Sequence, residues 1–177
     1  VKGKHIIVTG GSLGIGKETA RYLIEKGARV LVTGRSQERL DEAFNDKECE
    51  TITFDIGDSS NIEENAKNCL EKMDGQVDVL INNAANDDRH DWKDVTEDYW
   101  DERLSTNLRH QFFAIQHVAP EMIKKGGGSI INIGSNSWWE AGGGFPAYTT
   151  AKSAVHGLTR TMARDLGQHR FRVNTVV

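Results

Sequence analysis

Short apolar runs alternate with amphipathic stretches along this chain, and that alternation restricts the possible folds more than any other feature. Apolar runs typical of buried strands occupy residues 5–9, 29–33, 51–54, 78–82, 129–133 and 171–177. Apolar residues at helical spacing predict helices over residues 16–26, 37–44, 60–73, 98–125 and 147–167. Such alternation predicts an α/β fold with a doubly wound parallel sheet, covered on both faces, in strand order 3-2-1-4-5-6.

Two helices carry local signals that refine these expectations. Ser59 or Ser60 stands where a capping side chain is expected before the third helix. Pro120 lies inside the fourth helix, where a missing N–H is expected to kink it.

Length and charge exclude several classes of protein. The 177 residues carry 22 Lys and Arg against 26 Asp and Glu, a formal net charge of −4, and predict one domain, residues 1–177. No apolar stretch is long enough to span a membrane and no basic block exists, so we expect neither a membrane nor a nucleic-acid partner. Cys49 and Cys69 are expected to be thiols of a cytoplasmic protein rather than a disulfide. The six histidines lack metal-ligand spacing, so we expect no metal.

A glycine-rich turn joins the first predicted strand to the first predicted helix. Glycines let the backbone approach a phosphate closely, and the helix N-terminus offers unpaired N–H groups to an anion. A tight turn alone is the simpler interpretation, but the strand–turn–helix context favours a dinucleotide site. The candidate cofactor-binding residues of this turn are Gly10, Ser12, Leu13, Gly14, Ile15 and Gly16.

Tyr148 and Lys152 stand four residues apart on a predicted helix, which places both side chains on one face. An ammonium group beside a phenol favours the phenolate, so we expect Lys152 to lower the pKa of Tyr148 toward neutral pH. Tyr148 would then be a general acid or base for an alcohol–carbonyl pair. The alternative is a half-exposed pair on an ordinary helix.

Three motifs occur in one order: Thr9-Gly-x-x-x-Gly-x-Gly16, Asn82-Asn-Ala84 and Tyr148-x-x-x-Lys152. In this order they resemble the short-chain dehydrogenase/reductase family. The resemblance implies a Rossmann-type domain that transfers hydride between a nicotinamide cofactor and an alcohol or carbonyl. It also implies a catalytic tetrad of Asn107, Ser135, Tyr148 and Lys152, in which Lys152 also binds the nicotinamide ribose.

Within that resemblance, the serine holds the substrate oxygen, and Ser137 is a possible substitute two residues further on. The backbone of Asn107 is expected to bind a water that relays protons from the lysine. An irregular turn in an ordinary helix is the plainer interpretation of this asparagine.

The end of the second predicted strand bears on the choice of cofactor. Gly34 occupies the place of an acid that would bind the ribose hydroxyls of NAD, and Arg35 follows it, so we expect NADP with NAD possible. Leu13 stands where many NADP-using relatives have a second basic residue. The resemblance places Asp55 and Ile56 at the adenine. It places Asn83 and Ala84 beside the cleft, with Ala85 in a place usually held by glycine.

Segments 86–90, 99–103 and 135–139 resemble the bacterial aldose 1-dehydrogenases of the xylose or arabinose type. That branch oxidises a sugar at its anomeric carbon to a lactone. Trp138, and Trp139 beside it, could stack on a pyranose face and Asn136 could bind its hydroxyl groups, with Ser135 and Tyr148 completing the substrate set. Two alternatives remain open: a carbonyl reductase such as a 3-oxoacyl-acyl-carrier-protein reductase, and a dinucleotide-binding module without turnover.

Arg172-Val-Asn174 matches the last-strand motif of the family, and the chain stops shortly after it at Val177. We therefore expect a seventh strand and a substrate-covering lid to lie beyond this chain. The resemblance also implies a homo-oligomer, a dimer or tetramer that pairs the helices predicted over 98–125 and 147–167.

Overall fold

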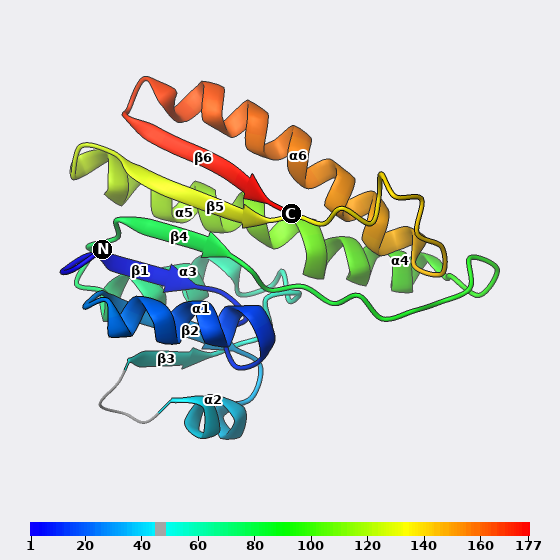
Figure 1. The fold of residues 1–177 in the computed structure, drawn as a ribbon, viewed down its shortest axis with the longest axis horizontal. Helices are drawn as coiled ribbons and strands as arrows, with labels where there is room; N and C mark the ends of the chain where they lie inside the picture. The colour runs from blue at the N-terminus through cyan, green and yellow to red at the C-terminus, as the bar shows by residue number, and fades with distance from the viewer. Residues whose placement is uncertain (45–48) are drawn as a thin grey trace.

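The computed structural model describes residues 1–44 and 49–177, and a single parallel sheet runs through its middle (Figure 1). The strands are β1 (His5–Val8), β2 (Arg29–Gly34), β3 (Glu50–Thr53), β4 (Val79–Asn82), β5 (Gly128–Ile133) and β6 (Phe171–Val176). Their order is β3-β2-β1-β4-β5-β6 and every neighbouring pair is parallel. The predicted fold class and strand order are confirmed.

Helices connect the strands, because parallel neighbours need a crossover between them. They are α1 (Gly14–Glu25), α2 (Gln37–Ala43), α3 (Ile62–Lys72), α4 (Glu97–Leu104), the π-helical segment η1 (Ser105–Arg109), α5 (His110–Lys124) and α6 (Pro146–Gly167). Figure 1 shows α1 in front of the sheet and α3 and α5 behind it. No helix in the described part of the chain has the length and apolar character needed to cross a bilayer.

Each strand side chain points to the face opposite its neighbour, so consecutive residues of β1 build two separate cores. Ile6 and Val8 pack with Ala20 of α1 and Leu40 of α2. Ile7, between them, packs on the other face. That second core adds residues of α3 and α5, namely Cys69, Met73, Ile115, Val118, Ala119 and Met122. Because both faces of the sheet are covered, the sequence of a central strand such as β1 is a continuous apolar run rather than an alternation of apolar and polar residues.

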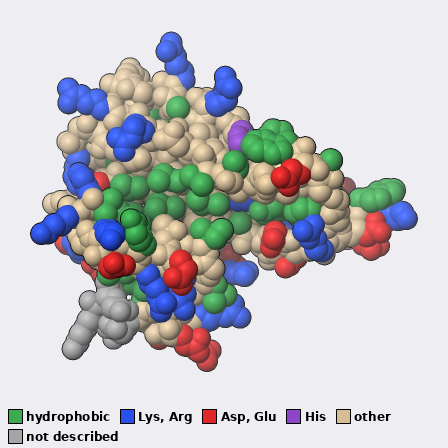
Figure 2. Space-filling view, viewed as in Figure 1, with side chains coloured by type: hydrophobic (Ala, Val, Ile, Leu, Met, Phe, Trp, Pro, Cys, Tyr) green, Lys and Arg blue, Asp and Glu red, His purple; other side chains and the backbone are tan. Residues whose placement is uncertain are grey.

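The covering of the front face is uneven. Figure 2 shows a band of hydrophobic side chains across the middle of this face, between α1 and α6. Ile131 and Ile133 of β5 pack against the core beneath α1 but are only half buried. Core coverage is therefore most complete around β1 and β2 and thinner over β5.

The helix predicted over 98–125 differs in structure from its prediction. Its irregularity is the π-helical segment Ser105–Arg109, whereas α5 continues through Pro120. Pro120 is exposed, so water can hydrate the carbonyl group that lacks its helical partner. The π segment has a different cause, described with the site below.

The third helix also differs, because it begins at Ile62 after Asn61, without a capping side-chain hydrogen bond. Neither predicted cap, Ser59 or Ser60, occupies that place. The backbone N–H and the hydroxyl of Ser60 both donate to Asp58 Oδ1, at 2.9 and 2.7 Å. This local turn uses the donor groups of Ser60 before the helix begins.

Candidate active site

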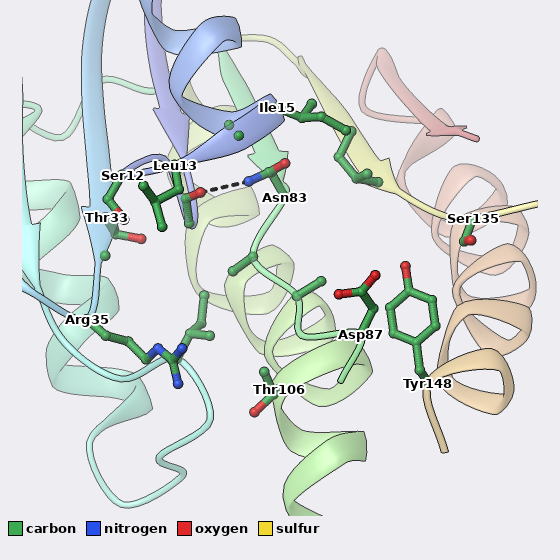
Figure 3. A pocket seen from close by; sticks show the side chains of 18 of the residues that line it. Ser12, Leu13, Ile15, Thr33, Arg35, Asn83, Asp87, Thr106, Ser135 and Tyr148 are labelled. Carbon is green, nitrogen blue, oxygen red and sulfur yellow. Dashed lines mark hydrogen bonds between the residues drawn. The ribbon is translucent and has the colours of Figure 1, made fainter. Parts of the chain in front are cut away.

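A cavity of about 760 Å³ opens at the carboxyl ends of the strands. In a parallel sheet all these ends lie along one edge, where doubly wound folds bind ligands. Each of β1 to β5 contributes the residues that follow it, and β6 contributes its own end. Figure 3 shows Arg35 and Tyr148 at opposite ends of this space.

Packing against β4 explains two of the four turn glycines. A Cβ on Gly10 would lie 2.6 Å from Ala84 Cα, and Gly10 also has a φ of +66°. Asn83 Nδ2 donates to the carbonyl oxygens of Thr9 and Gly10, at 3.0 and 2.9 Å, and a Cβ on Gly16 would collide with this amide. The predicted Asn-Asn-Ala motif therefore holds the glycine turn in shape.

The N-terminus of α1 faces the cavity and suits an anion. Leu13 precedes the helix without a side-chain hydrogen bond to its first N–H groups, and no acidic residue lies in the first turn. Gly14 has a φ of +53° and open space where a Cβ would be. Unpaired N–H groups and the positive end of the helix dipole fit the phosphates of a dinucleotide. All six predicted turn residues line the cavity.

Two arginines line the cavity at the β2 end. Arg35 follows β2, as predicted, and Arg39 reaches the same space from α2. Ser36 Oγ accepts from the Arg39 N–H at 3.3 Å, which fixes the first turn of α2 next to β2. Sequence reasoning missed Arg39, although its i, i+4 spacing from Arg35 was the available signal.

Asp55 and Ile56 line the same end of the cavity after β3, in agreement with their predicted neighbourhood. The Asp55 carboxylate accepts from the Gly57 N–H at 2.8 Å through Oδ1. Ala85 also lines the cavity, and it is not among the non-glycine residues with positive φ in the described chain, which are Asp74, Ala141 and Arg170. Ala85 therefore replaces the usual glycine without the backbone strain that a positive φ would impose on alanine.

Tyr148 and Lys152 lie one turn apart on α6, and both line the cavity. Lys152 is only 1% exposed, and its Nζ donates to the carbonyl oxygen of Ile133 at 2.6 Å. Burial lowers the pKa of Lys152 to about 8, an effect that the negative charge of Asp87 opposes. The ammonium lies 5.6 Å from the centroid of the Tyr148 ring.

The expectation that Lys152 lowers the pKa of Tyr148 is wrong for this structure. Burial raises the pKa of Tyr148 above its ordinary value, and the charge of Asp87 raises it further. A hydrogen bond with Ser135 and the charge of Arg89 lower the pKa of Tyr148 but do not offset the burial. The Lys152 ammonium is instead engaged with the end of β5.

Ser135 follows β5 and lies beside Tyr148, as the predicted tetrad requires. Ser135 Oγ is 2.7 Å from Ser137 Oγ and accepts from the Ser137 N–H at 3.2 Å. Within the described residues, Ser135 lines the cavity and Ser137 does not. The two hydroxyl groups therefore lie within hydrogen-bond distance of each other, with Ser135 on the cavity side.

Asn107, the fourth predicted tetrad member, is completely buried in the π-helical segment. Its Oδ1 accepts from the Asn86 N–H at 2.8 Å, and its Nδ2 donates to the Arg103 carbonyl oxygen at 2.9 Å. The Asn107 side chain thus donates to a backbone carbonyl group one turn earlier in the helix. This bond lies where the regular α-helix changes to the π-helical form. Thr106 rather than Asn107 lines the cavity.

A buried histidine secures the next turn of this helix. His110 Nε2 must donate to the Ala84 carbonyl oxygen, 3.1 Å away, because a carbonyl group can only accept. Burial lowers the pKa of His110 to about 3, and the charge of Lys152 lowers it further. A neutral His110 therefore ties α5 to the Asn82-Asn-Ala motif.

The predicted substrate residues divide into two groups. Asn136 lines the cavity together with Ser135 and Tyr148, and its amide donates to Glu140 Oε1 at 2.7 Å. Trp138 is not among the described residues that line the cavity, because its ring packs edge-on against His156 with 5.3 Å between centroids. Trp139 is 53% exposed and packs against Trp138.

Asp87 is a cavity residue that sequence reasoning assigned to a solvated loop or to a general resemblance. Figure 3 shows its carboxylate beside the Tyr148 ring. Within the described residues no hydrogen bond engages this carboxylate, although its charge acts on both Tyr148 and Lys152. Its place directly after the Asn82-Asn-Ala-Ala-Asn86 segment was the available signal.

Comparison with known proteins agrees with this geometry, since residues 4–177 match the family described as short chain dehydrogenase. The chain belongs to the short-chain dehydrogenase family. This short-chain dehydrogenase is 42% identical to a D-xylose 1-dehydrogenase of Caulobacter vibrioides, over all of its own length and 71% of the relative. It is 39% identical to a probable galactose dehydrogenase of Rhizobium meliloti, with the same coverage of both chains.

A solved structure extends the comparison to three dimensions. A metagenomic short-chain oxidoreductase, crystallised in complex with NADP, superposes on this short-chain dehydrogenase with a TM-score of 0.91 and 33% sequence identity. The match covers 98% of this chain and 81% of the other. The fold and the family thus rest on separate observations.

Proposed function

We propose that this NAD(P)-dependent oxidoreductase oxidises an aldose at its anomeric carbon to a lactone. The observation that carries the proposal is the Asp87 carboxylate, which lies beside Tyr148 and accepts no hydrogen bond from the part of the chain that the structure describes. A carboxylate in a cavity accepts hydrogen bonds from sugar hydroxyl groups. Relatives named for D-xylose and galactose dehydrogenation support the same substrate class.

The residues of the cavity fit the dinucleotide. The uncapped N-terminus of α1 would hold its phosphates, Asp55 and Ile56 its adenine, and Lys152 its nicotinamide ribose. When bound, the oxidised nicotinamide supplies the hydride acceptor.

Side chains of this protein bind the substrate oxygen and accept the proton of the substrate hydroxyl group. Ser135 donates its hydroxyl hydrogen to the substrate oxygen, and Tyr148, in its phenolate form, takes the alcohol proton at its phenol oxygen. Neither Lys152 nor Asn107 needs to touch the substrate: Lys152 supports the site from the end of β5, and the backbone of Asn107 is proposed to hold a relay water.

A substrate panel tests the proposal. Purified protein is assayed with D-xylose, L-arabinose, D-galactose and a β-keto thioester, each with both nicotinamide cofactors in the appropriate redox state. We expect aldose-dependent reduction of NADP⁺ and lactone as the product. Thioester reduction without lactone formation from any sugar would overturn the proposal.

A carbonyl reductase is the second candidate, and one observation favours it. Burial raises the pKa of Tyr148, which keeps the phenol protonated at neutral pH, and a protonated phenol is the form that donates to a carbonyl substrate. The same panel separates the two directions of reaction.

We further propose that NADP is preferred over NAD. The guanidinium groups of Arg35 and Arg39 at the cavity, and the absence of a carboxylate at Gly34, support a 2′-phosphate at this end. Binding of NADPH and NADH, each measured by quenching of protein fluorescence, compares the two affinities directly.

We also propose a cytoplasmic homo-oligomer, a dimer or tetramer that pairs the helices of residues 98–125 and 147–167. The 38% exposure of Phe112 on α5 supports an apolar contact on this helix. Light scattering of the wild type and Phe112→Glu tests the assembly, and two monomeric samples would contradict it.

A further inference from the structure

The Arg89 guanidinium group lies against the ring of Phe145, on the side away from Tyr148, and Phe145 in turn stacks on Tyr148. The Arg89 guanidinium carbon is 3.6 Å from the centroid of the Phe145 ring. Phe145 in turn stacks nearly parallel to the Tyr148 ring, with 5.4 Å between centroids and 17° between planes. Arg89, Phe145 and Tyr148 therefore form a three-layer stack that leads from the protein surface to the cavity.

Each layer is held by contacts outside the stack. Phe145 is buried and immediately precedes α6, so its ring is fixed against the first turn of the helix that carries Tyr148. Arg89 Nη1 donates to the Gly143 carbonyl oxygen at 3.0 Å, and the neighbouring His90 N–H donates to the Gly144 carbonyl oxygen at 2.8 Å. The loop after β4 is thereby joined at two points to the segment before α6.

The other side of that loop is anchored as well. Asn107 Oδ1 accepts from the Asn86 N–H, and Arg103, which is 8% exposed, lies 3.5 Å from the Asp88 carboxylate. Arg89 therefore projects from a loop secured on both sides. A guanidinium group held flat over an aromatic ring gains both stacking and electrostatic attraction.

We propose that Arg89 is a positioning residue, which acts through Phe145 to orient the Tyr148 phenol and whose charge favours the phenolate required for alcohol oxidation. This inference rests on the proposed role of Tyr148 as the proton acceptor. It concerns a side chain that contacts neither the glycine turn nor, within the described residues, the cavity itself.

Charged groups from each neighbouring element face Tyr148. From the loop after β4, Asp87 raises the pKa of Tyr148 and Arg89 lowers it. Lys152 lies on the same helix and Ser135 follows β5. Without the positive charge of Arg89, the negative charge of Asp87 is no longer opposed from this loop, so the pKa of Tyr148 rises. The limb of the pH profile that reports the phenolate then moves to higher pH.

The test compares Arg89→Met, Arg89→Lys and Phe145→Leu with the control Lys93→Met. Lys93 also forms a cation–π pair, 5.5 Å from the centroid of the Trp92 ring, but that pair is not part of the stack. For Arg89→Met we expect kcat of aldose oxidation to fall by about fivefold, with little change in cofactor KM. Arg89→Lys restores the pH profile but not all of kcat, because an ammonium group does not lie flat on a ring. Lys93→Met matches the wild type.

A second measurement does not require turnover. The tyrosinate absorbance of each protein is titrated, and the Tyr148 component is isolated by subtraction of the Tyr148→Phe titration in the same background. We expect this component to move to higher pH in Arg89→Met. Thermal unfolding of each variant verifies that it is folded. If Phe145→Leu does not fold, the titration and kinetics of Arg89→Met alone decide whether Arg89 is a positioning residue.

The outcomes separate this inference from the proposed function. Arg89→Met with wild-type kcat and an unchanged Tyr148 titration would overturn the positioning role, even if sugars are oxidised. Failure to oxidise any sugar, together with a shifted titration, would reject the aldose proposal and retain the role of Arg89. Full aldose oxidation by Tyr148→Phe would reject the role of Tyr148 as proton acceptor and with it the role of Arg89, while the aldose proposal would stand.

Discussion

At the β2 end of the cavity, Arg35 and Arg39 are exposed side chains on a short loop and a two-turn helix. At the β5 end, Lys152 and Asn107 are buried and each is bonded to a segment distant in sequence. Substitution of Arg35 or Arg39 at the β2 end should therefore have little effect on the stability of the sheet. At the β5 end, the same side chains serve both the proposed catalysis and the packing of the fold. A substitution there therefore changes both turnover and stability.

A buried polar chain explains the rigidity of the β5 end. Asn82 Nδ2 donates to Asn132 Oδ1, and Asn132 Nδ2 donates to Thr159 Oγ1, each at 2.9 Å. The Thr175 hydroxyl donates to the same Thr159 oxygen at 2.7 Å. These bonds link β4, β5, β6 and α6, and α6 carries Tyr148. Asn82 Oδ1 has no hydrogen-bond partner in the described residues, but the bonds that link the four elements favour one arrangement of them.

The largest expected effect lies at the buried end. Tyr148→Phe removes the proton acceptor, so kcat should fall by about a thousandfold. The cofactor site at α1 is untouched, so NADPH affinity should change little. Steady-state kinetics and fluorescence titration measure the two quantities. Tyr22→Phe on the exposed face of α1 serves as the matched control. Near-normal turnover in Tyr148→Phe would remove this residue from the central role.

The next effect concerns the charge of Lys152. Burial lowers its folded-state pKa to about 8 from the ordinary lysine value of 10.5, so between these pH values the unfolded chain binds the extra proton. The free energy of unfolding therefore rises with pH in this window, by up to about 3 kcal/mol from this group. Lys152→Met lacks this contribution, so its stability relative to wild type should decline from pH 8 to 10.5 in urea unfolding. A stability difference independent of pH would contradict the burial argument.

A smaller loss is expected from the polar chain. Asn132→Ala leaves the buried Asn82 amide without its acceptor and removes one of the two donors to Thr159 Oγ1, so the free energy of unfolding should fall by about 2 kcal/mol. Asn61→Ala, which changes an exposed amide ahead of α3, should be nearly neutral. Equal effects of the two substitutions would mean that the chain does not stabilise the sheet.

The smallest effects are expected at the exposed end. Arg35→Ala should weaken NADPH binding about tenfold, and Arg39→Ala by less, while NADH binding stays near the wild-type value. Arg160→Ala, on the exposed face of α6, is the control for loss of a positive charge. If both cofactors lose affinity equally, these arginines do not read the 2′-phosphate.

Local pattern sufficed to predict the strands, the doubly wound sheet and the glycine turn, whereas Asp55, Asn83 and Ser135 of the cavity were predicted from the resemblance to the family. Runs such as 5–9 and 29–33 are apolar on both faces, and a glycine turn between a strand and a helix has few other uses. The turn and the Tyr148–Lys152 pair lie within short stretches, so their spacing alone brings their members together.

The features that could not be predicted depend on partners distant in sequence. The sequence allowed an irregular turn at Asn107, but nothing near this residue indicates that its Oδ1 will accept from Asn86 or that the turn takes the π form. Phe145 had no sequence signal either, because its partner Arg89 lies on another loop. Trp138 appeared suited to a sugar face, but His156 of α6 holds its ring in packing. The pKa of Tyr148 depends on burial, which spacing does not report.

The π-helical segment Ser105–Arg109 also sets the rotational phase of the helix that follows it. Each residue of an α-helix turns its successors by about 100°, and the wider π turn absorbs one extra residue, so the same residues wound as a regular α-helix would rotate all of α5 by about that angle. Ile115 and Met122, both now fully buried, would turn away from the sheet. The segment therefore lets one continuous helix present an asparagine to the active-site loop and an apolar stripe to the core.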